Sequence, residues 1–344
     1  MSKDLLRGIV IGLANIIPGV SGGTLALVLG IYERLVNALN SLTAAPLLRA
    51  AGNCLLLRPG AFTRLWQEMK AADCLFLIRI GAGAVIAILA ASRVIAAALE
   101  HHYAASYGFF FGLVALSVIY PLRYMRRSGL REKLAMLAAV GMLFMINGLM
   151  SEETRIERAE KREAIRTERA VLAETQAVET ESRSFISLEL PEPARVLFIF
   201  AALALALSAM VLPGVSGSFV LLLLGVYFDI LIAVNERQVL VLLVAGLGAG
   251  TGLIFFAKIM SRLLAAWHDT TMAFMAGLMA ASLINLWPFK RSVVIGTQTV
   301  YLGNYLPREF GGHELLVLGC IAAGAGLVFA GLLLERCFGK VRGR

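Results

Sequence analysis

Hydrophobic residues follow one another in long runs along most of this chain. The longest uninterrupted runs are, roughly, Leu75–Leu99, Ala104–Tyr120 and Leu134–Met150 in the first half, and Val239–Ala265, Met272–Trp287 and Leu315–Leu334 in the second. A helix that crosses a bilayer needs about 20 mostly apolar residues. These runs therefore predict membrane-spanning helices, some of them with little length to spare.

Two further apolar segments are interrupted near their middle by the same motif. The sequence P-G-V-S-G occupies residues 18–22 and recurs at residues 213–217. The flanking apolar runs are Ile9–Ile17 and Leu25–Leu39 in the first copy, and Val196–Leu212 and Phe219–Ile232 in the second. Irregular backbone is not tolerated against lipid, but it is allowed where it lines a cavity or is buried in protein. We therefore expect two re-entrant hairpins that turn at mid-membrane.

The two halves of the chain match at four places in the same order. The matches are the two P-G-V-S-G turns, G-I-Y at residues 30–32 with G-V-Y at 225–227, G-A-G at 81–83 with 248–250, and F-G-L at 111–113 with A-G-L at 276–278. This order indicates a duplication with one sizeable gap in the second half. The predicted fold is an all-α polytopic membrane protein, an inverted-topology repeat in which each half is a re-entrant helical hairpin plus about three transmembrane helices.

The topology follows from the odd number of crossings in each half. A re-entrant hairpin returns the chain to its starting side and three spans then carry it across, so the second half is inserted upside down. Most lysines and arginines outside the linker then fall on the side of the N-terminus. The opposite side receives Arg93, Arg195, Arg237, Lys290, Arg291 and Arg308. Because basic residues collect in the cytoplasm, we expect both termini to be cytoplasmic in a bacterial inner membrane.

A strongly charged segment separates the two halves. Ser151–Leu190 is rich in Glu, Arg and Lys at spacings that form ion pairs along a helix, and Pro191 and Pro193 mark its end. We therefore divide the chain into a first membrane repeat (1–150), a charged extracytoplasmic linker helix (151–193) and a second membrane repeat (194–344). The segment Asn40–Ala72 has no counterpart in the second half; it is either an amphipathic stretch on the lipid surface or a plain cytoplasmic loop.

Composition narrows the class of protein further. Hydrophobic residues make up 59% of the chain and charged residues 16%, whereas soluble domains are about 45–50% apolar and about 25% charged. The net charge of +9 is therefore an orientation signal, and we expect membrane lipids rather than nucleic acid as partners. The cysteines lack C-x-x-C spacing, and the chain lacks H-E-x-x-H and P-loop motifs. We expect no enzyme activity, no metal site and no cofactor.

The two turns are the first candidate site. A helix that begins at a glycine-rich turn presents backbone N–H groups and the positive end of its dipole, which suits an anion. The candidate substrate-binding residues there are Asn15, Pro18, Gly19, Ser21, Gly22, Gly23, Thr24, Gly214, Ser216, Gly217 and Ser218. The alternative is a tight packing bend without a ligand, and for Asn15 a polar contact to a neighbouring helix.

Charged residues near the membrane supply further candidates. Arg79 and Arg93 lie within the first predicted span, where arginine is costly and suits a phosphate; alternatively, both reach the two interfaces by extending along the helix. Glu33 and Asp229 follow the G-x-Y matches. They are either interfacial ends of the hairpin arms or carriers of protons for coupled transport.

The first turn also carries a family resemblance. Residues 14–24 (A-N-I-I-P-G-V-S-G-G-T), followed by G-I-Y-E at 30–33, resemble the opening signature of the bacterial polyprenyl-phosphate transporters, and the second P-G-V-S-G turn is similar to that family as well. The resemblance covers nearly the whole chain outside Ser151–Leu190. It implies a transporter of undecaprenyl phosphate, moving this carrier lipid from the outer to the inner leaflet for recycling in cell-envelope and peptidoglycan synthesis.

Two other functions compete with this hypothesis. An ion-coupled secondary transporter of a small anion would use the same fold, and a lipid phosphatase would need a catalytic constellation that the sequence lacks. The sequence contains no signal for the energy source or for the number of chains in the assembly.

Overall fold

The computed structural model describes residues 3–16, 20–43, 45–56, 58–148, 156, 192–227, 229–230, 233, 237–296, 298–309 and 311–339. The helices of the first half are α1 (Lys3–Ile16), α2 (Gly22–Val28), α3 (Tyr32–Ser41), α4 (Ala45–Leu55), α5 (Ala61–Ala71), α6 (Cys74–His101), α7 (Tyr103–Ser117), α8 (Ile119–Tyr124) and α9 (Leu130–Gly148). Those of the second half are α11 (Glu192–Val211), α12 (Gly217–Leu223), α14 (Val239–Ala266), α15 (His268–Leu286) and α16 (Gly312–Gly339). The predicted linker helix lies outside the described residues.

Six of the described helices are long and apolar enough to cross a membrane: α6, α7 with α8, α11, α14, α15 and α16. Five of them coincide with predicted spans. The sixth predicted span, Leu134–Met150, forms α9, which begins with the charged residues Arg131, Glu132 and Lys133 and is not among the six. Helix α11 is the sixth candidate, although its sequence predicts a hairpin arm. Its 20 residues exceed the 14 of α1, the first arm of the other copy.

One small sheet departs from the all-helical prediction. Strands β1 (Lys290–Ile295) and β2 (Gln298–Asn304) pair antiparallel and join α15 to α16. Their sequence is rich in Val, Thr and Tyr, which favour strands, and Gly296 at the turn has a φ of +58°. The hairpin is fixed to the end of α15, because Trp287 Nε1 donates to the Tyr305 carbonyl and Asn304 Nδ2 to that of Ile284.

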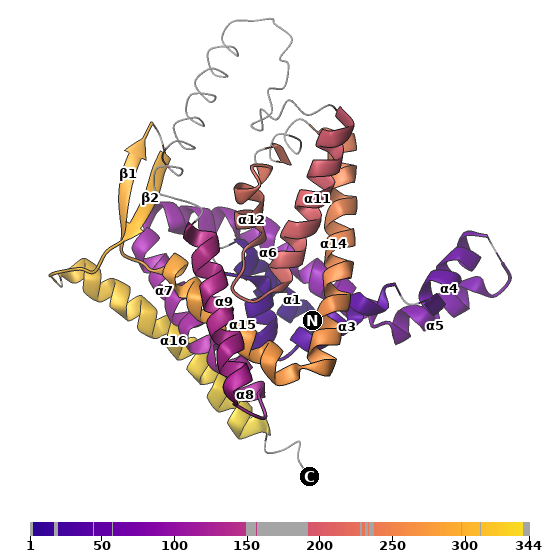
Figure 1. Ribbon diagram of the computed structural model, residues 1–344, viewed down its shortest axis with the longest axis horizontal. Helices are drawn as coiled ribbons and strands as arrows, with labels where there is room; N and C mark the ends of the chain where they lie inside the picture. The colour runs from indigo at the N-terminus through magenta and orange to yellow at the C-terminus, as the bar shows by residue number, and fades with distance from the viewer. Residues whose placement is uncertain are drawn as a thin grey trace, which may run out of the picture.

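The first helix of each half packs along the first long helix of the same half. Helix α1 lies against α6, and α11 against α14 (Figure 1). A Cβ on Gly83 of α6 would collide with the backbone of Leu5, and a Cβ on Gly248 of α14 with the backbone of Phe200. Leu5 and Phe200 stand equally far before the two turn motifs. The structure thus equates Gly83 with Gly248, whereas the sequence match paired Gly81 with Gly248.

The remaining long helices pair across the two halves. Helix α7 of the first half packs against α16 of the second, and α9 of the first packs against α15 of the second (Figure 1). Gly112 of α7 meets the backbone of Ile321, and Gly277 of α15 meets that of Met136. These two glycines occupy the F-G-L and A-G-L matches of the sequence. Each half therefore contributes one helix to a pair that the other half completes.

The G-x-Y matches break the helices that follow the turns. Gly30 has a φ of +64° and Gly225 a φ of +76°, in the left-handed region that glycine enters without strain. The predicted arm Leu25–Leu39 is therefore not one helix; it divides at Gly30 into α2 and α3. In the second copy, α12 ends just before Gly225. The repeated glycine marks the same backbone feature in both copies.

The segment without a counterpart in the second half is helical. Helices α4 and α5 form a hairpin that projects from the bundle in Figure 1, held at its base by a small cluster of Leu47, Ala72 and Cys74. Phe62 and Trp66 of α5 are exposed. The segment is thus not an irregular loop; its contact with lipid stays a prediction.

Candidate functional site

The two P-G-V-S-G turns lie against each other inside the bundle. The Ser21 hydroxyl lies within hydrogen-bond distance of the carbonyl oxygens of Met210 (3.2 Å) and Leu212 (3.0 Å), which precede the second turn. In the opposite direction, Gly214 N donates to Thr24 Oγ1 at 3.1 Å. Ser21 and Thr24 are 2% and 1% exposed. Two segments that are far apart in the sequence therefore meet as a directly bonded pair.

Close approach of the turns depends on glycine. Gly214 has a φ of +85°, and a Cβ there would lie 2.7 Å from the Leu278 carbonyl oxygen. A Cβ on Gly23 would collide with the Val211 carbonyl. Any larger residue at Gly23 would push the first turn away from the segment before the second turn, and any larger residue at Gly214 would push the second turn away from α15.

The amide groups of the first turn are occupied by oxygen atoms of the protein. Gly22 N donates to Asn15 Oδ1 at 3.0 Å, and Gly23 N donates to Ser21 Oγ at 3.1 Å, which caps α2. A phosphate at this turn would have to replace those side-chain oxygens. In this structure, the side chains of Asn15 and Ser21 thus accept the hydrogen bonds that a phosphate at the turn would need.

The remaining candidate residues of the two turns are only partly among the described residues. Pro18 and Gly19 lie outside the described residues, and nothing is described of the Ser218 side chain. Ser216 is half-buried. Gly217 begins α12, and a Cβ there would lie 2.8 Å from the Ala206 carbonyl oxygen.

A buried hydroxyl at the beginning of α3 was not singled out from the sequence. Tyr32 is 2% exposed, and its hydroxyl has no hydrogen-bond partner among the described residues. Burying an unpaired hydroxyl costs about 1–3 kcal/mol, so this atom is a free donor and acceptor in the main core cluster. Its signal in the sequence was its place in the G-I-Y match.

The two arginines of α6 are not brought to the turns. Arg79 and Arg93 are both exposed, on a helix whose outer surface also carries exposed Ile78, Leu89 and Val94. Within the described part of the chain, neither arginine makes an ion pair. Arg79 lies near the beginning of α6, where a long side chain can extend to the interface.

Polar contacts gather at one end of the bundle, which we call the ionic end: residues 4, 33–37, 73, 126–132 and 261–270. Glu33 Oε1 lies 3.0 Å from His268 Nε2, and His268 Nδ1 lies 3.2 Å from Asp269 Oδ1. The Asp269 carboxylate also accepts hydrogen bonds from the backbone amides of Arg126 and Arg127 at 3.0 Å each. Elements of both halves are thus tied together at this end.

Further contacts join α1, α3 and α14 to the ionic end. Arg34 of α3 pairs with Asp73 before α6 and lies 3.6 Å from Asp4 of α1. Ser261 Oγ donates to Asn37 Oδ1 at 2.9 Å, which joins α14 to α3. Glu33 is exposed here, whereas Asp229 of the second copy is 6% exposed. The two candidate proton carriers therefore occupy unlike environments.

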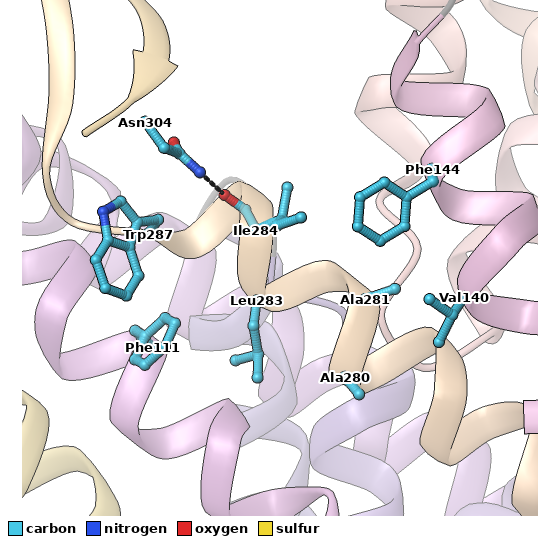
Figure 2. A pocket seen from close by; sticks show the side chains of 9 residues that line it. All are labelled: Phe111, Val140, Phe144, Ala280, Ala281, Leu283, Ile284, Trp287 and Asn304. Carbon is cyan, nitrogen blue, oxygen red and sulfur yellow. Dashed lines mark hydrogen bonds between the residues drawn. The ribbon is translucent and has the colours of Figure 1, made fainter. Parts of the chain in front are cut away.

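Cavities open at the opposite end of the bundle. We call it the hairpin end, after the hairpin of β1 and β2; the beginnings of α7 and α16 also lie there. An apolar cavity of about 350 Å³ is lined by Phe111, Val140, Phe144, Ala280, Ala281, Leu283, Ile284, Trp287 and Asn304 (Figure 2). An arginine cleft of about 760 Å³ is lined by Arg291, Asn304, Tyr305, Leu306, Pro307 and Arg308. A histidine cavity of about 390 Å³ includes His101, His102, Lys290, Tyr301, Tyr305 and His313.

The family model of undecaprenyl phosphate translocase-like proteins matches residues 11–301. The chain belongs to the undecaprenyl phosphate translocase-like family. This match includes both turns, all the long helices except α16, and β1. The resemblance that began with the first turn therefore extends over most of the chain, and with its apolar helices it makes this member of the family a multi-pass membrane protein.

Two relatives carry the same name. The polyprenyl-phosphate transporter of Vibrio cholerae is 30% identical over 288 residues, covering 84% of this chain and 78% of that protein. The polyprenyl-phosphate transporter of Staphylococcus aureus is 27% identical over 295 residues, covering 83% of this chain and 86% of that protein. No solved structure matches this member of the undecaprenyl phosphate translocase-like family significantly.

Proposed function

We propose that this protein translocates undecaprenyl phosphate across the bacterial cytoplasmic membrane, from the outer to the inner leaflet, so that the carrier lipid is reused in peptidoglycan and other envelope synthesis. The family match over residues 11–301 carries this proposal. The named activity of both relatives and the apolar helices support it. A lipid with a phosphate headgroup needs a polar passage inside an apolar bundle, while its tail stays in lipid.

A sealed-liposome assay tests the function. Purified protein is reconstituted into vesicles with undecaprenyl phosphate in both leaflets, and a phosphatase that cannot cross the membrane is added outside. We expect the protein to expose the inner pool to the phosphatase, whereas vesicles without protein protect it. Protein that moves a soluble anion such as inorganic phosphate, and leaves the lipid pool protected, would support a small-anion transporter instead.

The proposed architecture is an inverted repeat with two re-entrant hairpins. The pairs α7–α16 and α9–α15 support it. Helix α7 corresponds to α15 and α9 to α16, so the second pair repeats the first with the two halves exchanged. The pairing of Arg34 with both Asp4 and Asp73 supports the hairpin, since α1 enters and α3 returns at the same end. Alternating access in such folds comes from one repeat rocking against the other.

The proposed orientation places the ionic end in the cytoplasm, with both termini. The contacts there join the segments that the positive-inside rule assigns to one side. The hairpin end then faces the outer leaflet, where the carrier lipid is released. A thiol reagent that cannot cross membranes should label Ser292→Cys in intact cells and Ser128→Cys only after permeabilisation; the reverse pattern would invert the orientation.

The turns and α6 provide the proposed substrate contacts within the membrane. We propose that the headgroup passes the paired turns when Asn15 and Ser21 release Gly22 N and Gly23 N, with Thr24 and Tyr32 beside the path. Arg79→Ala and Arg93→Ala, measured in the liposome assay, decide whether these arginines take part; unaltered transport would leave them as surface residues. Proton coupling through Glu33 or Asp229 predicts that the amide variants lose their dependence on a proton gradient.

A further inference from the structure

Three adjoining cavities at the hairpin end, which we together call the recess, change from apolar to cationic. The apolar cavity and the arginine cleft share Asn304, and the arginine cleft and the histidine cavity share Tyr305. Figure 2 shows Phe144 and Val140 of α9 on one side of the apolar cavity, Phe111 and Trp287 on the other, and Asn304 bonded to the carbonyl of Ile284. The Asn304–Tyr305 backbone is thus the border between an apolar and a charged compartment.

The charged compartment carries more cations than carboxylates. Arg291 and Arg308 are exposed, and neither makes an ion pair with a described residue. Lys290 lines the histidine cavity and donates to the Asn285 carbonyl at 2.8 Å. The carboxylates nearby in the sequence are Glu309, which is exposed, and Glu314, which accepts a hydrogen bond from Gly311 N. An anion is therefore the ligand that the arginine cleft favours.

The depth of the recess fits the headgroup region of a leaflet. The cavity is lined by residues in the last part of α15 and in the second half of α9, close to where both helices reach the hairpin end. Trp287 lies in its wall with the indole N–H bonded to the Tyr305 carbonyl at 2.8 Å. Tryptophan prefers this position because its ring is apolar and its N–H is polar. Apolar space thus lies toward the membrane and cationic space toward water.

We propose that this recess is the extracytoplasmic loading site for the carrier lipid. Arg291 and Arg308 hold the phosphate monoester, and the apolar cavity between α7, α9 and α15 takes the first isoprene units. Arginine forms paired hydrogen bonds to phosphate oxygens, and the adjoining apolar cavity favours a phosphate on a lipid over free phosphate. This inference rests on the proposed function, because it names the place where that substrate first binds.

Trp287 serves as a reporter for the test. The other tryptophans, Trp66 and Trp267, are replaced by Phe, and the full chain in detergent micelles is titrated with a short polyprenyl phosphate, the corresponding polyprenol and inorganic phosphate. We expect the polyprenyl phosphate to change Trp287 fluorescence at the lowest concentration. Replacing both Arg291 and Arg308 by Ala should weaken its apparent affinity by roughly tenfold or more and leave that of the polyprenol unchanged.

Matched variants separate charge, cavity and fold. Arg64→Ala removes an exposed cation of α5, far from the recess along the chain, and should bind as the parent does. Lysine at positions 291 and 308 keeps the charge without the paired geometry and should restore part of the affinity. Ala280→Phe fills the apolar cavity and should weaken binding of both prenyl ligands. Unchanged affinity in the double Ala variant, or equal competition by inorganic phosphate, would overturn the loading site.

The liposome assay keeps the two proposals apart. Wild-type transport together with unaltered binding and transport in the double Ala variant overturns the loading site and leaves the proposed function standing. Arginine-dependent binding without wild-type transport supports the loading site and contradicts translocation.

Discussion

The two ends of the helical bundle differ in what holds them together. At the ionic end, Glu33, His268 and Asp269 link α3, α15 and the segment between α8 and α9, and Asn37 and Ser261 link α3 to α14. At the hairpin end, the same bundle opens into an apolar cavity and a cationic cleft. In the proposed orientation, the contacts of the ionic end lie on the cytoplasmic side, and the cavity and cleft of the hairpin end lie on the outer side. Under the proposed alternating access, the contacts of the ionic end would have to open during one transport cycle.

Locking the ionic end should have the largest effect. With the native cysteines replaced by Ala, Asn37→Cys and Ser261→Cys are joined by a short thiol-specific cross-linker across the position of their 2.9 Å hydrogen bond. We expect lipid transport in liposomes to stop, because this end can no longer open, and to return when a reducible cross-linker is cleaved. Each single cysteine treated alike serves as the control. Transport at the parent rate in the locked protein would show that the ionic end does not open.

Forcing the second turn away from α15 should have the next largest effect. Gly214→Ala places a Cβ close to the Leu278 carbonyl oxygen and holds a non-glycine residue at a φ of +85°. We expect a loss of roughly 2–4 kcal/mol in the free energy of unfolding, seen as a lower thermal midpoint in detergent. Gly326→Ala in α16 meets open space, so it should leave the midpoint unchanged. Equal midpoints for the two variants would mean that the second turn is not tightly packed against α15.

Weakening the ionic end should have the smallest of the three effects. Asp269→Asn keeps one acceptor and turns an NH₂ group toward a backbone amide, so one of the hydrogen bonds from Arg126 N and Arg127 N is lost. We expect faster labelling of Ser261→Cys by a thiol reagent, because this end opens more often. Glu68→Gln on α5 removes a carboxylate outside the network and should leave the labelling rate unchanged. No acceleration in Asp269→Asn would place the closing contacts elsewhere.

Another carboxylate of the ionic end shows how the network responds to acid. Glu132 accepts hydrogen bonds from Gly129 N at 2.8 Å and from the Thr270 hydroxyl at 3.2 Å. These donors, first of all the Gly129 amide, lower the pKa of the Glu132 carboxyl. A lowered pKa in the folded protein stabilises it above the ordinary pKa of glutamate, and the benefit is lost as the pH falls through the lowered value. This contact therefore persists at neutral and mildly acidic pH.

Sequence reasoning succeeded where the signal was local. Five of the six long runs became candidate spans with nearly the predicted limits, since crossing a membrane depends on a run of apolar residues. The break at the first turn was also visible, because glycine and a polar N-cap residue end one helix and begin another. The hairpin of β1 and β2 had a signal that was missed, in the Val, Thr and Tyr residues around Gly296.

The rest depended on contacts between distant segments. Helix α6 is apolar on all sides, so its sequence could not show that Arg79 faces outward. The pairing of α7 with α16 follows from how the halves interlock, which no spacing within one half reveals. The free amides expected at the first turn are capped by Asn15 and Ser21, because only the folded chain brings Asn15 back over Gly22.

Helix α15 connects the ionic end with the hairpin end. Its first residues, His268 and Asp269, belong to the ionic end, and Ile284 and Trp287 at its other end hold β1 and β2 beside the loading site. A helix of 19 residues is a rod of roughly 28 Å. A tilt of this rod that releases the contacts of Asp269 would necessarily shift the arginines at the far end. In the proposed transport cycle, such a tilt would couple the arrival of a lipid at one membrane face to the contacts at the other.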